Sequence, residues 1–265
     1  MKIGIMILAA FLILYACAKV PLTGRNQLAA IPSNEINALS VDSYRQVIEQ
    51  DGLSKNQGYI DQVNRVGKNI TAAVELFMTQ NNLQNKIENF KWEYNVIASE
   101  QMNAFCMPGG KIAFYEGIMP VCHDDNGVAV VMSHEIAHAI AQHGNERMSQ
   151  ALIVNLGGVA LSEALNSQPQ MTQDLAMAAF GVGSQVGIML PYSRLHESEA
   201  DELGLYFMAM AGYDPQKAPE FWQRMLDQGG ERPPEFLSTH PDPENRIDDL
   251  NKNMEKAMEY YRQTK

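Results

Sequence analysis

The chain has 265 residues, of which 46% are apolar and 19% charged, and its formal net charge is −11. This length is enough for one well-buried globular domain. The acidic balance and the lack of any cluster of Lys and Arg exclude nucleic acid as an expected partner, because phosphate contacts need concentrated positive charge.

Residues 1–16 have the pattern of an export signal. Lys2 precedes an apolar run, Ile3 to Leu14, which has the length of a signal-peptide core and is short for a membrane span. The run ends in Leu14-Tyr15-Ala16-Cys17, which resembles a bacterial lipobox, where cleavage before the Cys leaves it to carry lipid. Ala18 follows, which resembles the outer-membrane sorting signal. We therefore expect a lipoprotein on the periplasmic face of the outer membrane, the alternative being a plain secretory signal and a soluble periplasmic protein.

The remaining chain divides into a lipid-anchored tether, residues 17–32, and a single domain, residues 33–265. Apolar residues at helical spacing predict two scaffold helices, over about 33–50 and 59–78. Ser33 is a suitable N-cap for the first helix.

Strand periodicity begins in the next segment, residues 90–97, which alternates around Trp92, Tyr94 and Val96. Residues 102–107 and 111–115 flank Pro108-Gly109-Gly110, which predicts a hairpin. Together these segments predict a small antiparallel sheet. One strand is either a simple core strand or an edge with which an extended peptide substrate pairs, and we favour the edge.

Two further cysteines, Cys106 and Cys122, follow Cys17 in the sequence. In an oxidising compartment they can pair, but a buried free thiol at Cys106 fits the pattern as well, so both alternatives stay open.

The helix expected over about 126–150 contains Ser133-His134-Glu135-Ile136-Ala137-His138, a His-Glu-x-x-His motif. Residues four apart lie about 40° apart around a helix, so His134 and His138 project from one face, as two ligands of a tetrahedral Zn²⁺ do. Glu135 is placed to take a proton from water at the metal. His143 falls roughly 140° around the same helix and is not expected to be a ligand.

Two apolar segments follow, residues 151–165 and 175–190. Each is at most 16 residues long and interrupted by polar residues, whereas a span needs about 20 apolar residues. We interpret them as an antiparallel helix pair near the active site, the alternative being a lid on a membrane surface.

A third metal ligand is available in the helix predicted over residues 193–211. Glu197 and Asp201 share one face of this helix, so Glu197 can bind the metal while Asp201 accepts the outer N–H of a ligand His. Glu199 is the rival ligand, but it lies about 160° from that face, and we favour Glu197.

The last part of the chain predicts a helix opened by Asp214-Pro215 and extending to about residue 227, and a charged helix over about 243–262. His240 lies between them, on a loop before Pro241. Pro241 biases His240 towards an extended backbone.

Several of these motifs together resemble the HtpX and CAAX-prenyl-protease family of zinc peptidases, and most closely its soluble lipoprotein branch. The resemblance covers most of the chain after residue 17. It is carried by the His134–His138 motif and by the segments Asn103–Lys111, Ser193–Asp201, Gly212–Pro215, Thr239–Pro241 and Arg246-Ile247.

The resemblance implies that His240 lies near the metal. His240 then either donates a hydrogen bond to the oxyanion, which we favour, or occupies the fourth zinc position in a resting state. Arg246 is the other candidate for stabilising the oxyanion.

We therefore predict a gluzincin-like α+β metallopeptidase, mainly helical, with a small antiparallel sheet beside the metal-binding helix. It would hold one Zn²⁺ through His134, His138 and Glu197, and hydrolyse peptide bonds with Glu135 and His240 as catalytic residues. The resemblance implies unfolded or damaged envelope proteins as substrates. A lipoprotein that keeps this fold as a chaperone is the competing hypothesis, although the intact Glu135 argues against it. A zinc hydrolase that acts on non-peptide substrates is a third and weaker hypothesis.

Overall fold

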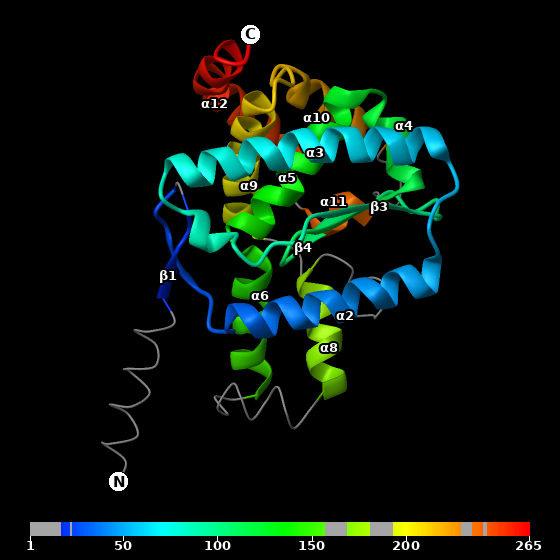
Figure 1. Ribbon diagram of the computed structural model, residues 1–265, viewed down its shortest axis with the longest axis vertical. Coiled ribbons are helices and arrows are strands. Elements are labelled where there is room, and N and C mark those ends of the chain that lie inside the picture. The colour runs from blue at the N-terminus through cyan, green and yellow to red at the C-terminus, as the bar shows by residue number, and fades with distance from the viewer. Residues whose placement is uncertain (1–16, 22, 157–168, 181–192, 229–234, 241–242) are drawn as a thin grey trace.

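The computed structural model describes residues 17–21, 23–156, 169–180, 193–228, 235–240 and 243–265. The first half of the chain contains the strands and the scaffold helices (Figure 1). In chain order these elements are β1 (Cys17–Lys19), β2 (Asn26–Leu28), α2 (Ser33–Asp51), α3 (Gln57–Gln80), η1 (Gln84–Lys86), β3 (Glu93–Ile97), β4 (Ala104–Met107) and β5 (Lys111–Tyr115).

The second half is helical. Its elements are η2 (Glu116–Ile118), α4 (Met119–Cys122), α5 (Asp125–Ile140), α6 (His143–Leu156), α8 (Pro169–Ala179), α9 (Arg194–Met210), α10 (Lys217–Asp227), α11 (Glu235–Thr239) and α12 (Pro243–Arg262). The described residues are therefore mainly helical, as predicted, with a small three-stranded sheet in the middle of the chain and an antiparallel pair, β1 and β2, at its start.

The three-stranded sheet has the order β3-β5-β4. The hairpin around Pro108 is confirmed, since β4 and β5 pair antiparallel with Met107 opposite Lys111. The expectation of a wholly antiparallel sheet is wrong, because β3 pairs parallel with β5, Glu93 opposite Lys111. The chain crosses from one edge of the sheet to the other between β3 and β4, so β5 returns between them. Alternation of apolar residues predicts a strand but not which neighbour it pairs with.

Both faces of this sheet are buried, because successive side chains of a strand point to opposite faces. On one face Val96, Ala104, Cys106, Ile112 and Phe114 join the core formed with α3, α5 and α9. On the other face Ile97, Phe105, Met107, Ala113 and Tyr115 pack with α2, α6 and α8. Figure 1 shows α3 and α2 running on opposite sides of the strands. The sheet thus fixes the metal-binding helix α5 on one side.

Helices α5 and α9 pack closely along their length. Gly204 of α9 permits this, because a Cβ there would lie 3.0 Å from the backbone N and Cα of His134. A Cβ this close to backbone would force the helices apart. The close contact brings the motif on α5 opposite Glu197 on α9.

The helix carrying the motif is shorter than predicted. We expected one helix to about residue 150, but α5 ends at Ile140 and α6 begins at His143. The break falls at Gln142, whose φ is 60°. A side chain in this left-handed region ends an α-helix, and no turn-forming residue marks the position in the sequence.

Other element boundaries agree with the predictions more closely. Helix α12 has the expected bounds, and α9 begins after Ser193, whose side chain accepts from the backbone N–H of His196. Helix α10 begins at Lys217 and not at Pro215, because Asp214 forms a turn by accepting from the N–H of Gln216.

The two apolar segments are described in part. Residues 143–156 and 169–179 form α6 and α8, which pack together, and residues 157–165 and 181–190 of the two segments lie outside the described residues. Residues 1–16, the predicted signal, also lie outside them. Across the described ranges, none of the helices combines the length and the apolar character that crossing a bilayer requires.

Candidate metal centre

Four buried side chains converge beside the β-sheet. His134 and His138 come from α5, Glu197 comes from the first turn of α9, and His240 follows α11. One ligand atom of each lies within 4.8 Å of those of the other three, and each residue is at most 2% exposed. The structure therefore brings together the three predicted metal ligands and the predicted loop histidine.

The two motif histidines are held by partners on α9 and α6. Nδ1 of His134 lies 3.0 Å from Oδ1 of Asp201, the outer partner predicted from the sequence. Nδ1 of His138 lies 2.9 Å from Nδ1 of His143. Nε2 of His134 and Nε2 of His138 are 3.0 Å apart and face the same point.

Arg246 holds the carboxylates of α9 in place. Its Nη1 lies 2.8 Å from Oε2 of Glu197, and its Nη2 donates to Oδ1 of Asp201 at 2.6 Å. The guanidinium also lies over the ring of Trp222, 3.5 Å from the ring centroid. Arg246 thus binds the carboxylates around the histidines, and its role as an oxyanion donor stays a prediction.

The rival ligand, Glu199, lies outside the four-residue cluster. Its carboxylate is hydrogen-bonded by Thr23, by Arg25 and by His143. The opposite faces that Glu197 and Glu199 occupy on α9 account for this difference.

The electrostatics of the cluster favour added positive charge. Burial and the neighbouring Arg246 each lower the pKa of His134, but Asp201 and Glu197 outweigh them and raise it to about 9. Burial alone raises the pKa of Glu197, yet His240 and Arg246 hold it well below its usual range. Burial raises the pKa of Glu135.

The residues fit a divalent cation. Asp201 fixes the proton of neutral His134 on Nδ1, and His143 fixes that of His138 on Nδ1, so both Nε2 atoms present lone pairs to one point. When both rings are neutral, as metal ligands must be, these two lone pairs lie 3.0 Å apart and a cation between them would satisfy both.

The formal charges agree with this assignment. Glu135, Glu197 and Asp201 carry three negative charges against the one positive charge of Arg246, which leaves −2 for these four side chains. Two imidazoles and one carboxylate are a catalytic zinc donor set.

His240 completes the cluster from the side of α11. Its Nδ1 lies 3.1 Å from Oε1 of Glu197 and 3.3 Å from Nε2 of His134. Its Nε2 lies 3.5 Å from Oε1 of Glu135. This placement fits a fourth donor, and both this role and the oxyanion role expected above stay predictions.

The two remaining cysteines play no part in this centre. Both are free and buried, and burial raises the pKa of each thiol, so neither is an activated nucleophile.

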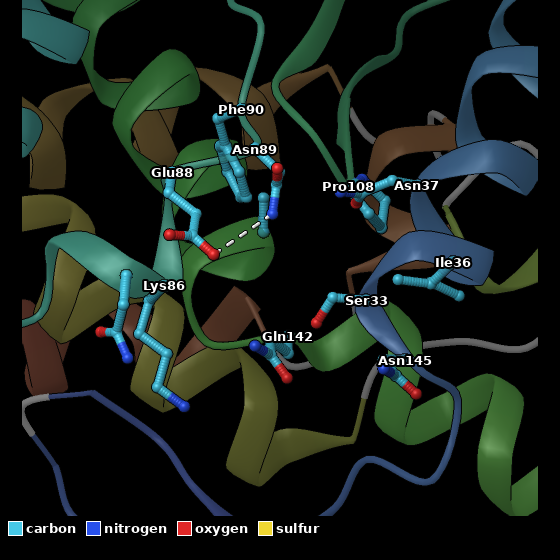
Figure 2. A pocket seen from close by; sticks show the side chains of 12 residues that line it. Ser33, Ile36, Asn37, Lys86, Glu88, Asn89, Phe90, Pro108, Gln142 and Asn145 are labelled. Carbon is cyan, nitrogen blue, oxygen red and sulfur yellow. Dashed lines mark hydrogen bonds between the residues drawn. The ribbon is translucent and has the colours of Figure 1, made fainter.

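A pocket of about 270 Å³ opens at the end of α5. Figure 2 shows the segment from Lys86 to Phe90 on one side and α2 with Pro108 on the other. Ala139, the neighbour of His138, also lines the pocket. The pocket therefore lies between the metal-binding helix and the end of β4.

Sequence reasoning missed Arg25, which lies in the segment predicted to be a tether. It also missed the contact between His143 and Nδ1 of His138. A continuous helix would place His143 away from His138, and only the break at Gln142 brings the two rings together. The helix preceding His240, α11, was missed as well, since it has only five residues.

A two-helix metal centre with a His-Glu-x-x-His motif and a glutamate from a second helix defines the zinc metallopeptidases of the gluzincin type. The chain belongs to Peptidase family M48, whose sequence profile matches residues 65–254.

Named relatives agree with this membership. The chain is 35% identical over 186 residues to mitochondrial metalloendopeptidase OMA1 of Saccharomyces cerevisiae, which is 67% of this chain and 51% of that protein. Its counterpart in Schizosaccharomyces pombe is 31% identical over 233 residues, 86% of this chain and 64% of that protein. The Beta-barrel assembly-enhancing protease of Escherichia coli (strain K12) is 30% identical over 166 residues, 60% of this chain and 33% of that protein. The matches span between one third and two thirds of these relatives.

Proposed function

We propose that this chain is a zinc-dependent endopeptidase that cleaves unfolded or damaged polypeptides of the cell envelope. The observation that carries the proposal is the convergence of His134, His138 and Glu197, with Glu135 beside them, in the geometry of one metal site. One Zn²⁺ per chain, held by these three ligands, would polarise the scissile carbonyl and make a bound water more acidic.

Glu135 is the acid–base residue of this mechanism. Its carboxylate is buried, and burial raises its pKa, so it holds a proton more readily than an exposed glutamate. It accepts the proton of the attacking water and passes it to the leaving amine. Its neighbour His240 lies within 3.5 Å and can donate a hydrogen bond to it or to the substrate.

The substrate path follows the edge strand β4. One end of β4 is next to α11, since the N–H of Phe236 donates to the carbonyl of Met102, and the other end leads through Pro108 to the pocket. Main-chain pairing with an edge strand tolerates varied side chains, which suits unfolded substrates. Antiparallel pairing with β4 directs the amino-terminal part of the peptide towards Pro108, so the pocket in Figure 2 would receive residues before the cleaved bond.

The deciding experiment compares wild type with Glu135→Gln. The variant should keep the fold and zinc but lose cleavage of an unfolded protein such as casein. Glu202→Gln, on a more exposed part of α9, is the matched control and should cleave normally. Equal activity of wild type and Glu135→Gln would reject Glu135 as the base, and a lack of cleavage by wild type would favour the competing chaperone function.

We further propose that the chain acts as a lipoprotein on the periplasmic face of the bacterial outer membrane. The sequence before Cys17 supports export and lipidation, and the name of the Escherichia coli relative refers to β-barrel assembly. Cys17→Ser should abolish lipid labelling and release the exported protein from membranes. Continued membrane association of this variant would contradict lipid anchoring.

A further inference from the structure

A second group of charged side chains lies beside the metal cluster, centred on Arg25. Nη1 and Nη2 of Arg25 donate to the two carboxylate oxygens of Glu146 at 3.1 Å and 2.8 Å. Its Nε donates to Oε2 of Glu199 at 2.9 Å. These side chains are 18%, 8% and 4% exposed, so the ion pairs are largely shielded from water.

From Glu199 the hydrogen bonds continue to a metal ligand. Oε2 of Glu199 lies 2.9 Å from Nε2 of His143, and Nδ1 of His143 lies 2.9 Å from Nδ1 of His138. An ionised carboxylate only accepts, so a neutral His143 carries its proton on Nε2 and accepts at Nδ1. His138 therefore donates from Nδ1, which leaves the lone pair of its Nε2 for the metal.

We propose that Arg25, Glu199 and His143 form a hydrogen-bonded chain that fixes the ring orientation and tautomer of His138, and that the amino-terminal segment thereby increases zinc affinity. These are positioning residues. The inference rests on the proposed zinc site and adds to it a requirement for residues that precede the first scaffold helix. Outer partners of metal-bound imidazoles typically contribute 10-fold to 100-fold in affinity.

The local structure of the amino-terminal segment supports this role. Gly24 has a φ of 68°, which suits glycine, and its N–H donates to the carbonyl of Val20 at 3.0 Å. The N–H of Val20 in turn donates to the carbonyl of Arg25 at 2.9 Å. This tight turn directs both Thr23 and Arg25 to the same carboxylate, that of Glu199, although Arg25 and Glu199 are 174 positions apart in the sequence.

Glu146 provides a matched control within the same cluster. Like Glu199, it is a mostly buried carboxylate bound to Arg25 and to one histidine. Its histidine is His196, whose Nε2 lies 3.0 Å away, whereas the hydrogen bond to His143 comes from Glu199. If the cluster is purely structural, substitution of either glutamate should change zinc affinity by a similar amount. The proposed hydrogen-bonded chain predicts that substitution of Glu199 weakens zinc binding more than substitution of Glu146.

The test uses the full chain and measures zinc dissociation constants by competition with a chromophoric chelator. Glu199→Gln replaces the carboxylate by a weaker, neutral acceptor and should weaken zinc binding roughly 10-fold to 100-fold. Glu146→Gln should bind zinc with near wild-type affinity. In the zinc-free state it should nevertheless lose about as much thermal stability as Glu199→Gln. The visible spectrum of the Co²⁺-loaded protein should change in Glu199→Gln only.

A second pair of variants tests the chain at His143, independently of the folding of Glu199→Gln. His143→Leu should lose as much zinc affinity as Glu199→Gln, and His143→Gln, whose amide can still accept and donate, should retain more. Equal zinc affinities for Glu199→Gln and Glu146→Gln, or wild-type affinity for His143→Leu, would overturn the inference. A wild-type chain that binds zinc but cleaves no peptide would contradict the proposed function alone.

Discussion

Nε2 of His240 lies 3.5 Å from Oε1 of Glu135, while Nδ1 of the same ring points into the group of metal ligands. His240 therefore touches both the base and the metal position. A catalytic zinc keeps one position open for water, and a fourth protein donor there blocks it. We therefore expect that in this conformation His240 keeps water from the metal position, as in a resting state.

His240→Ala should consequently raise the initial rate of peptide cleavage, because it opens the position that water must occupy. The rate is measured at equal zinc occupancy with a fluorogenic peptide. A fall of roughly 10²–10³ would instead assign His240 as an oxyanion donor. An unchanged rate would remove it from the mechanism.

Loss of any one of the three ligands should empty the metal site. His134→Ala, His138→Ala and Glu197→Ala are each expected to lose most of the zinc found in wild type, because each change removes one of the helix-borne donors that fix the position of the metal. Zinc content is measured by mass spectrometry after dialysis, with Glu202→Ala on the same helix as control. Full zinc content in Glu197→Ala would show that another residue supplies the third ligand.

Acid should weaken the attachment of the amino-terminal segment through Glu146. Burial raises the pKa of this carboxyl, but hydrogen bonds from His196 and Arg25 outweigh burial and lower it to about 2. A carboxyl with a lowered pKa stabilises the fold above its ordinary pKa of about 4.5, and this contribution disappears as pH falls towards 2.

Between pH 5 and pH 2, the free energy of unfolding of the zinc-free protein should therefore fall by on the order of 1–3 kcal/mol more than that of Glu146→Gln. Urea unfolding at a series of pH values measures the difference. Parallel pH profiles for the two proteins would show that Glu146 is not the responsible group.

A bulky residue at the rim of the pocket should impair long substrates selectively. Asn89 is exposed and lines the pocket, so Asn89→Trp can fill part of it without disturbing the core. We expect kcat/KM to fall roughly 10-fold for peptides extended on the amino-terminal side of the cleaved bond, equivalent to about 1.4 kcal/mol. Peptides truncated on that side should be cleaved normally. Glu49→Trp, on an exposed position of α2, is the control, and equal losses for long and short peptides would contradict the proposed path.

Much of the fold followed from local patterns. Apolar residues at helical spacing predicted α2 and α3 to within a few residues, since each of these helices buries one face. The pairing of β3 with β5 was not predictable in the same way, because alternation sets which face of a strand is buried but leaves its neighbour and direction open.

The sequence by itself determined the metal-binding donors, because helical periodicity alone places His134 and His138 on one face and separates Glu197 from Glu199. The tertiary structure decided how those donors are held. Only packing brings Arg25 to Glu199, and only the backbone reversal at Gln142 turns His143 towards His138. Contacts between distant segments depend on the relative placement of whole elements, which no local spacing of residues records.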